Sequence, residues 1–159
     1  MTVDTKSVTG RRELQFASFP EILADLDQIQ SRPQKSLGNF SVGQICDHVA
    51  RGMTLALDGP PVTVPWFMRF VGSFFKNRII NGGPMPAGFK LPKTAQKELF
   101  SETPIPDADG IASLRSAVQR TMREPQRAPH GVFGPLTREE SDKIHLRHAA
   151  MHLSFIVPE

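Results

Sequence analysis

The stretch that decides the fold is "IHLRHAAMHLSF", residues 144 to 155, which contains three of the five histidines of this 159-residue chain. It continues a segment that opens with "TREE" at Thr137. A threonine followed three residues later by a glutamate, here Glu140, has the capping-box spacing that begins a helix. The sequence therefore predicts a helix from Thr137 to about Phe155. Its histidines point inward or along the edge of the buried face, and its outer side holds Lys143, Arg147, Ala150 and Ser154.

Three earlier segments also carry apolar residues at helical spacing. The first begins at Ser18 and ends before Pro33, and the second begins at Ser41 and is stopped by the prolines after Asp58. Both serines are followed three residues later by Glu or Gln, which predicts a capping box at each start. A third helix is expected at residues 108–123. The predicted apolar faces are Phe19, Ile22, Leu23, Leu26 and Ile29; Val42, Ile45, Val49, Met53 and Ala56; and Ile111, Leu114, Val118 and Met122.

Four amphipathic helices without a convincing alternating strand pattern predict an all-α fold, specifically a four-helix bundle. Residues 59–106 are too numerous for a bundle loop, so we expect them to form a long crossover insert between the second and third helices. No repeat or composition break divides the chain, and the sequence predicts a single domain over residues 1–159.

The insert contains an aromatic helix candidate, "PWFMRFVGSFFKNRII", at residues 65–80. Its aromatic and polar side chains fall on opposite helical faces, and we expect the aromatic face to pack against the bundle, because apolar faces are usually buried. A lid over a pocket and a dimer contact are the alternatives. A membrane-surface helix is less favoured, because only three basic residues accompany it. The aromatic face consists of Trp66, Phe67, Phe70, Val71, Phe74 and Phe75, and the polar face of Arg69, Ser73, Lys76 and Asn77.

Composition argues against several classes of protein. The net charge of +3 is small and the basic residues are scattered, so nucleic acid is not an expected partner. No run approaches the roughly 18 apolar residues of a membrane-spanning helix, and the polar N-terminus lacks the apolar region of a secretory signal. The single cysteine, Cys46, cannot form an internal disulfide and is expected to be a small core residue. We expect a cytoplasmic protein with a small-molecule substrate and no membrane partner, and a homodimer stays open.

His148 and His152 are four residues apart, so on a helix their Cβ atoms are neighbours about 5–6 Å apart. That spacing suits two imidazole nitrogens bound to one divalent metal at about 2.0–2.1 Å. Ala149 stands where an "HExxH" metalloprotease motif has its glutamate, which excludes that class of enzyme. The alternative is a pair of buried histidines hydrogen-bonded to backbone or carboxylate groups.

A third ligand candidate is His48, in "QICDHVARG" of the second predicted helix. Packing of the two helices would bring His48 opposite the histidine pair and leave the remaining coordination positions to water or substrate, as in catalytic metal sites. Gly52 lies inside the predicted helix, where glycine is less favourable than alanine by about 1 kcal/mol. One reason to have glycine at this position is to leave space for a neighbouring group near His48. Cys46 and Asp47 face elsewhere, and Asp47 is expected either in a salt bridge or as support for a ligand.

The other two histidines are weaker candidates. His145 precedes His148 by three residues. It could bind the metal in place of His148, or it could support the metal ligands by donating a hydrogen bond. His130, in "APHGVFGP", falls in the loop before the last helix. We expect it to be exposed or packed in a turn, with a place at the rim of a pocket as the alternative.

A histidine late in a second helix, together with an "HxxxH" pair in the last helix, resembles the DinB-like (YfiT-like) metalloenzyme superfamily. More narrowly, "LGNFSVGQICDH", "GPMPAGFKLPK" and "FGPLTREESDKIHLRHAAMHLSFIVP" look like one bacterial branch of unknown function, and the resemblance spans about Arg12 to Pro158. It implies a four-helix bundle with a long crossover. It also implies a divalent metal, nickel or zinc, held by His48, His148 and His152. Characterised members of the superfamily include mycothiol-dependent isomerases and bacillithiol or glutathione S-transferases, which implies a low-molecular-weight thiol whose pKa the metal lowers.

Two functions follow as hypotheses. The first is a metal-dependent enzyme, either a thiol S-transferase or a small-molecule hydrolase, in which Lys90, Lys93 or Arg51 steers an anionic substrate. The second is a non-catalytic bundle that binds a ligand or partner through the aromatic insert, with histidines that are only structural. Solvent exposure of the aromatic face would favour the second hypothesis.

Overall fold

The computed structural model describes residues 3–59, 66–88 and 99–159, without the side chains of residues 68, 71 and 73. In this part of the chain the fold is mainly α-helical, as predicted, with one small two-stranded sheet. The helices are α1 (Phe19–Gln30), α2 (Val42–Asp58), α3 (Trp66–Asn81), α5 (Asp107–Arg123) and α6 (Arg138–Leu153), and the strands are β1 (Gln34–Ser36) and β2 (Ile156–Pro158).

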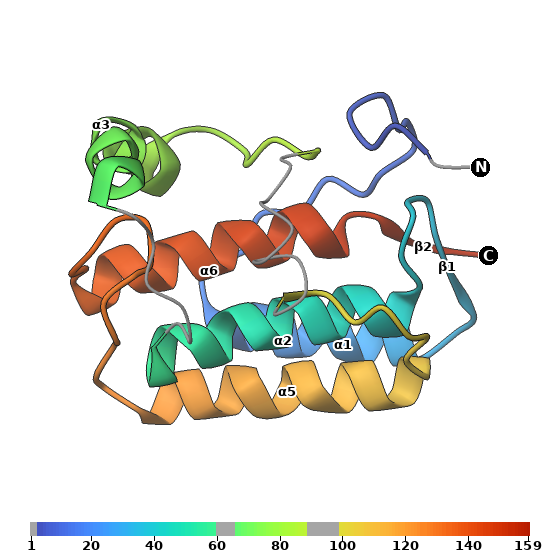
Figure 1. The fold of residues 1–159 in the computed structure, drawn as a ribbon. Coiled ribbons are helices and arrows are strands. Elements are labelled where there is room, and N and C mark those ends of the chain that lie inside the picture. Colours follow the sequence, from blue (N-terminus) through green and yellow to red (C-terminus); the bar gives the residue numbers. More distant parts are fainter. Residues whose placement is uncertain (1–2, 60–65, 89–98) are drawn as a thin grey trace.

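Four of the helices lie side by side with roughly aligned axes (Figure 1). Helices α1 and α2 each pack on α5 and on α6, and their facing sides share one apolar core. The predicted apolar faces of α1, α2 and α5 are buried or partly buried, with one exception. Met122 is 40% exposed, because it lies in the last turn of α5 and lines a surface hollow beside Phe19, where α1 is only beginning.

The capping boxes predicted for α2 and α6 are confirmed. The Ser41 hydroxyl accepts the backbone N–H of Gln44, and the Gln44 side chain accepts the N–H of Ser41. The same reciprocal bonds join the two predicted residues at the start of α6. The box predicted at Ser18 is wrong, since its hydroxyl donates to the carboxylate of Glu21, a stronger acceptor than a neutral group, and caps no backbone N–H.

Two glycines allow the backbones of α2 and α5 to approach closely. A Cβ on Gly110 would lie 2.2 Å from the carbonyl oxygen of Gly43, and a Cβ on Gly43 would lie 2.2 Å from the carbonyl oxygen of Ile105. The N–H of Gly43 also donates to Asp107 at 2.8 Å, which ties the start of α2 to the start of α5. This contact holds α2, the helix that carries His48, in a fixed position on the core.

The end of α6 is buried on the side that the helical pattern assigned to solvent. Ala150 and Ser154 are only 8% and 3% exposed, so their predicted position on the outer side is wrong. Arg11, from the segment before α1, covers Ser154. Its guanidinium donates to the Ser154 hydroxyl and the Met151 carbonyl, and it lies 4.1 Å above the centre of the Phe155 ring.

Arg12 ties the same N-terminal segment to α1 and α6. Its guanidinium donates to both carboxylate oxygens of Asp25, at 2.6 and 3.0 Å, and to the carbonyl of Leu153 at 2.9 Å. Asp25 is 6% exposed, and a carboxylate buried to this degree requires a counter-charge. The interaction therefore joins three parts of the chain that are distant in sequence.

Helix α6 ends at Leu153, earlier than predicted, and β2 follows it. This strand pairs antiparallel with β1, with Ser36 opposite Ile156. Neither strand was predicted, because each has only three residues and is too short to show an alternating pattern.

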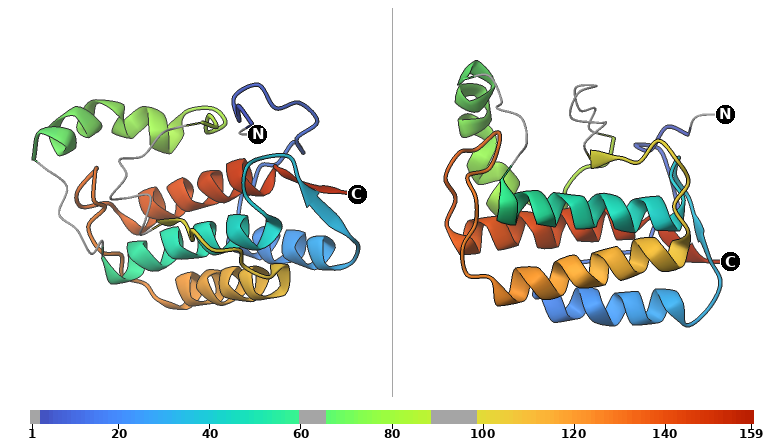
Figure 2. Two further views of the ribbon diagram at one scale, coloured as in Figure 1. Left: turned by 45° about the vertical axis from the view of Figure 1, so that its right-hand side comes forward. Right: turned by 60° about the horizontal axis from the view of Figure 1, so that its bottom comes forward.

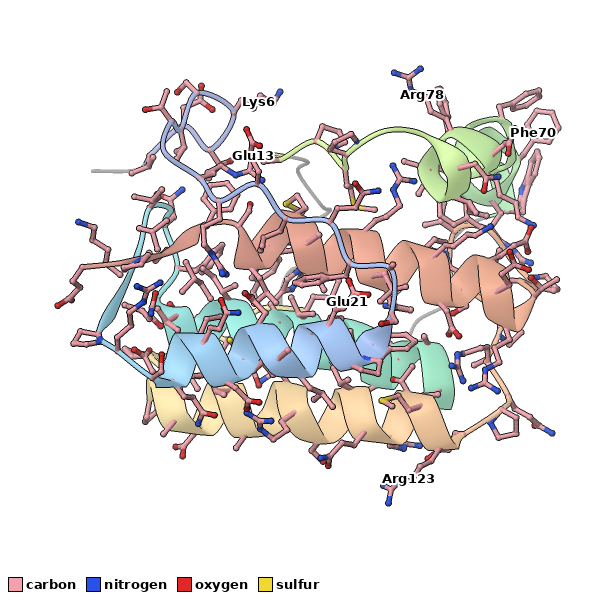
Figure 3. All side chains as sticks on the ribbon, turned by 180° about the vertical axis from the view of Figure 1, so that it is seen from behind. Lys6, Glu13, Glu21, Phe70, Arg78 and Arg123 are labelled. Carbon is pink, nitrogen blue, oxygen red and sulfur yellow. The ribbon has the colours of Figure 1, made fainter. Side chains whose placement is uncertain are left out.

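Helix α3 lies against α6, outside the group of four (Figure 2). The side of α3 that meets α6 includes Lys76, whose ammonium is 3.0 Å from the Glu140 carboxylate. Arg147 of α6 donates to the carbonyl of Ile79, in the last turn of α3, and to that of Gly83, just beyond the helix. The predicted burial of the aromatic face is therefore wrong. Phe70 lies on the outer side of α3 and is 60% exposed (Figure 3). The aromatic side chains that are exposed are Trp66, Phe67, Phe70, Phe74 and Phe75.

The predicted insert at residues 59–106 is only partly described. Residues 60–65 and 89–98 lie outside the described part of the chain, and with them the proposed substrate-steering residues Lys90 and Lys93. No helix within the described ranges is long and apolar enough to cross a membrane.

Candidate metal centre

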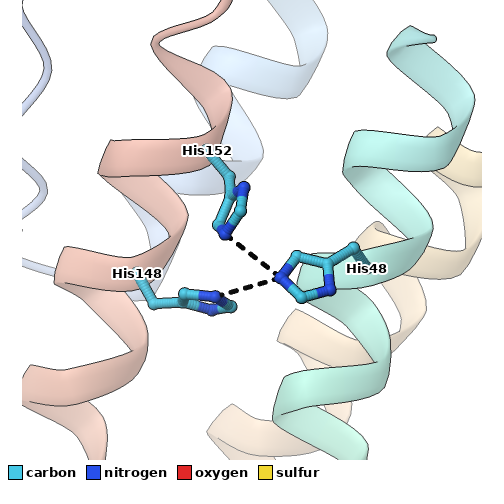
Figure 4. Close-up of side chains that lie close together, drawn as sticks. All are labelled: His48, His148 and His152. Atoms are coloured by element: carbon cyan, nitrogen blue, oxygen red, sulfur yellow. Dashed lines mark hydrogen bonds between the residues drawn. The ribbon is translucent and has the colours of Figure 1, made fainter. Parts of the chain in front are cut away.

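Three histidine side chains meet between α2 and α6 (Figure 4). His48 comes from the middle of α2, and His148 and His152 come from successive turns of α6. The Nε2 atom of His48 lies 3.2 Å from Nε2 of His148 and 3.1 Å from Nε2 of His152. Tertiary packing thus brings together the three residues that the sequence singled out, with one ligand atom of each within 4.8 Å of the others.

The backbone at Leu99 fixes the chemical form of His48. Its Nδ1 atom lies 3.0 Å from the Leu99 carbonyl oxygen. Because a carbonyl only accepts hydrogen bonds, Nδ1 carries the proton, and Nε2 has a lone pair directed at the other two rings. A hydrogen bond from the second ring nitrogen to a carbonyl is the usual way in which a metal-binding histidine is oriented.

Two phenylalanines hold the plane of the same ring. Phe100 stacks on His48 with ring centroids 3.9 Å apart and 8° between the planes. Phe40 in turn stacks on Phe100 at 4.7 Å. Together with the bond to Leu99, this stack limits rotation of the imidazole, so the position of its Nε2 atom is set before any ligand arrives.

The nitrogen separations agree with a three-histidine metal site. Ligands about 2.0–2.1 Å from one ion are separated by about 3.3 Å in a tetrahedron and by about 3.0 Å on one face of an octahedron. The observed 3.1 and 3.2 Å fall between these values. Nε2 of His48 has a single lone pair, so it can accept only one good hydrogen bond, although two ring nitrogens lie close to it. A metal ion at the common centre would instead bind one lone pair from each of the three rings. The arrangement is therefore compatible with binding of a divalent metal.

Burial keeps the three imidazoles neutral. Desolvation lowers the pKa of His48 to about 4, although its bond to Leu99 acts in the opposite direction. Desolvation also lowers the pKa of His148 and of His152 well below the ordinary value, and repulsion from neighbouring histidines adds to the effect. Parts of both residues still reach the surface. The rings are thus in the deprotonated form that binds metal.

His145 and His130 do not join this cluster. His145 is 7% exposed, and its Nδ1 has no hydrogen-bond partner among the described residues. Burial, with smaller contributions from the charges of His130 and Arg127, lowers the pKa of His145 to about 4. Nδ1 of His130 accepts the backbone N–H groups of Val132 and Phe133, and its ring stacks on Phe133. The expectation that His130 is packed in a turn is confirmed.

Other candidate residues of α2 have structural positions. Asp47 accepts a hydrogen bond from Arg51 at 2.6 Å, so of its two predicted roles the structure shows the salt bridge. Cys46 is fully buried, as predicted, and burial raises the pKa of its thiol to about 12. At neutral pH this thiol is protonated and points into the core, so it is not a metal ligand.

Gly52 gives clearance to a different histidine from the one predicted. A Cβ at this position would lie 3.5 Å from Cε1 of His148, and His48 is not among its near neighbours. That distance is an ordinary van der Waals contact, so alanine fits here as well. The need for glycine inferred from the sequence is therefore not supported.

The residues that orient His48 were missed by the sequence analysis. Leu99 contributes only its backbone carbonyl, for which no sequence signal exists. Phe100 belongs to a short polar stretch far from His48 in sequence, and stacking between them becomes visible only when the chain is folded. An aromatic residue near the end of the insert was the one available indication, and it is a weak one.

Residues 8–159 match the family described as "Protein of unknown function (DUF1569)", and the chain belongs to that family. A search of curated proteins found no significant match, and a search of solved structures found none. Because the family description assigns no activity, the chemistry of the three histidines carries the functional argument.

Proposed function

We propose that His48, His148 and His152 bind one divalent metal ion through Nε2, and that the chain is a metal-dependent enzyme acting on a small molecule. The observation that carries the proposal is the convergence of three neutral imidazole nitrogens. Three protein ligands leave at least one coordination position for water or substrate. Nickel or zinc is the proposed ion, since imidazole is a suitable ligand for both.

The proposal includes the fold that the sequence resemblance implies. Helices α1, α2, α5 and α6 would be the four-helix bundle of a DinB-like protein, with residues 59–106 as its crossover insert. The mutual packing of these four helices supports this assignment. The positions of the histidines support it too, with one on the second helix and an "HxxxH" pair on the last.

The proposed chemistry is thiol S-transfer or hydrolysis. A bound divalent ion lowers the pKa of a coordinated thiol or water, so that a strong nucleophile exists near neutral pH. The only cysteine of the chain is the buried Cys46, so the thiol must come from solution as a low-molecular-weight compound. Such thiols are present in the reducing cytoplasm, the compartment that we propose for this protein. His48, whose ring is fixed by Leu99 and Phe100, would hold the ion in a defined position.

The experiment that tests this function is a thiol-transfer assay with 1-chloro-2,4-dinitrobenzene as the electrophile. Protein loaded with zinc or nickel is combined in turn with glutathione, bacillithiol and mycothiol, and hydrolysis of a p-nitrophenyl ester is followed in parallel. We expect metal-dependent turnover in the wild type and in the control His130→Asn, which lies outside the cluster. His152→Ala should lose it. Metal binding without turnover on any substrate would overturn the enzymatic part of the proposal alone.

A second candidate function is non-catalytic binding through the aromatic face of α3, with a metal that is only structural. The exposure of five aromatic rings on one short helix favours it. Failure of every turnover assay in a protein that retains its metal would make this candidate the better one.

A further inference from the structure

We propose that the exposed aromatic face of α3 is a homodimer interface, in which α3 of one copy packs antiparallel on α3 of a second copy. This inference is independent of the metal centre. It begins from the five aromatic residues already listed, whose exposed fractions range from 55% to 79%. Aromatic side chains bury about 150–250 Å² each when covered, so their exposed surface amounts to roughly 500–800 Å². A patch of that size is at or above the upper end of what monomeric proteins expose.

The area fits a second copy of the chain. A standard protein interface takes about 800 Å² from each partner, and the rings with their immediate neighbours on α3 supply an area of that order. Aromatic residues are also enriched at the centres of such interfaces. A two-fold axis would cover both copies of the patch at once.

Contacts on the opposite side of α3 hold its aromatic face outward. The Lys76–Glu140 ion pair and the bond from Arg147 to the Ile79 carbonyl join α3 to α6, and a second bond from Arg147 holds Gly83, just beyond the helix. A Cβ at Gly72 would lie 2.4 Å from a methyl carbon of Val132, so the helix backbone is close to the turn that it covers. Rotation of α3 about its axis to bury the aromatic rings against α6 would break these contacts. A second copy of the chain would cover their exposed surface without disturbing these contacts.

The sequence of α3 is self-complementary about Gly72. Phe70 and Phe74 lie two positions on either side of it, and Trp66 and Arg78 lie six positions on either side. In a symmetric interface, residue i meets residue j and j meets i, so antiparallel helices centred here would bring Phe70 near the partner's Phe74. They would also bring Trp66 near the partner's Arg78, a cation–π pair. Arg78 is exposed and points away from the other helices, as this pairing requires (Figure 3).

The surrounding charge favours a protein partner over a lipid surface. Of the basic residues on α3, Lys76 is paired with Glu140, which leaves only Arg69 and Arg78 at the surface. Helices that lie on anionic membranes carry a polar face rich in Lys and Arg, and two exposed arginines are few for that role.

Trp66 is the only tryptophan of the chain, so its fluorescence reports on this surface alone. We would measure the mass of the full-length protein by sedimentation over about 1–200 μM, together with the emission maximum of Trp66. The expected result is a monomer–dimer equilibrium in which the emission shifts to shorter wavelength as the dimer forms. Phe74→Glu should weaken association by roughly 100-fold and leave the emission at long wavelength. The matched control Met122→Glu, at an exposed apolar position on α5, should dimerise like the wild type.

Each of the other outcomes would overturn the proposal. A wild type that stays monomeric at the highest concentration would do so, and so would a dimer that Phe74→Glu leaves unchanged. A monomer whose emission shifts only with phosphatidylcholine–phosphatidylglycerol vesicles would identify a lipid-binding helix. Circular dichroism checks that Phe74→Glu is folded. If it is not, Phe74→Ala replaces it, with an expected weakening of about 10-fold and no change in helicity.

Discussion

At the scale of one residue, the metal centre depends on how firmly His48 is held. Its Nδ1 donates to the Leu99 carbonyl, and Phe100 covers the face of its ring at a centroid distance of 3.9 Å. His148 and His152 come from one rigid helix and are placed by its periodicity alone. The ligand from α2 is therefore the one whose surroundings determine the affinity of the site.

Replacing Phe100 with leucine should weaken metal binding without abolishing it. The variant keeps all three ligands but loses the ring that fixes the plane of His48, and changes to such supporting groups cost about 10- to 100-fold in affinity. Competition with a chromogenic chelator measures the effect. Phe133→Leu is the matched control and should bind metal like the wild type, because its ring stacks on His130, outside the cluster. Equal affinities for wild type and Phe100→Leu would show that the stack does not support the site.

His145 gives a prediction about pH. Its pKa is about 6.5 when the chain is unfolded and about 4 in the folded protein, since burial disfavours the charged ring. The unfolded state therefore binds the extra proton first as the pH falls. The stability associated with a neutral His145 is complete above pH 6.5 and is lost as the pH approaches 4, an effect of about 3 kcal/mol.

Urea unfolding of the metal-free protein between pH 4.5 and 7.5 measures this loss. The variant His145→Asn cannot take up the proton, so its stability should fall less steeply below pH 6.5 than that of the wild type. Parallel curves for the two proteins would show that His145 is not buried in a neutral form.

At the scale of the elements, sequence predicts what local contacts determine. The capping boxes at Ser41 and Thr137 and the adjacency of His148 and His152 depend on residues within one turn, and all are present. That His48 meets this pair was expected from a family resemblance and from helix packing in general. No periodicity within α2 specifies it, because the contact spans about a hundred residues.

Helix α3 shows where such prediction fails. Periodicity correctly separates its aromatic face from its polar face, but it does not say which face meets the rest of the molecule. The outcome depends on Glu140 and Arg147 of α6, which bind Lys76 and the backbone at the end of α3. The prediction for Ser154 failed for the same reason, since Arg11 covers it from a segment that has no helical pattern.

The α2–α5 contact gives a prediction at this scale. Gly110→Ala places a Cβ 2.2 Å from a backbone oxygen of α2, which cannot move without shifting the helix. We expect a loss of about 1–3 kcal/mol in the free energy of unfolding, the usual cost of overpacking. Gly52→Ala is the control, because its new Cβ makes an ordinary 3.5 Å contact and alanine favours the helix by about 1 kcal/mol. Urea titration compares the two, and a Gly110→Ala variant as stable as Gly52→Ala would contradict the close approach.

At the scale of the whole molecule, the N-terminal segment is joined to the core by the Arg12–Asp25 interaction. Arg12→Ala leaves the buried carboxylate without its partner, and we expect a loss of roughly 3–5 kcal/mol in stability. Arg115→Ala removes an exposed bridge to Asp27 and should cost no more than about 1 kcal/mol. Similar losses for the two variants in chemical denaturation would mean that the N-terminal segment is not anchored as described.

Metal content, measured by plasma mass spectrometry on untagged protein after reconstitution with zinc or nickel and removal of free ion, tests the central claim most directly. We predict close to one ion per chain in the wild type and in His130→Asn, and almost none in His48→Ala or in the double variant His148→Ala, His152→Ala. A wild type without metal, or variants that retain as much metal as the wild type, would contradict the claim that these three histidines form a metal site.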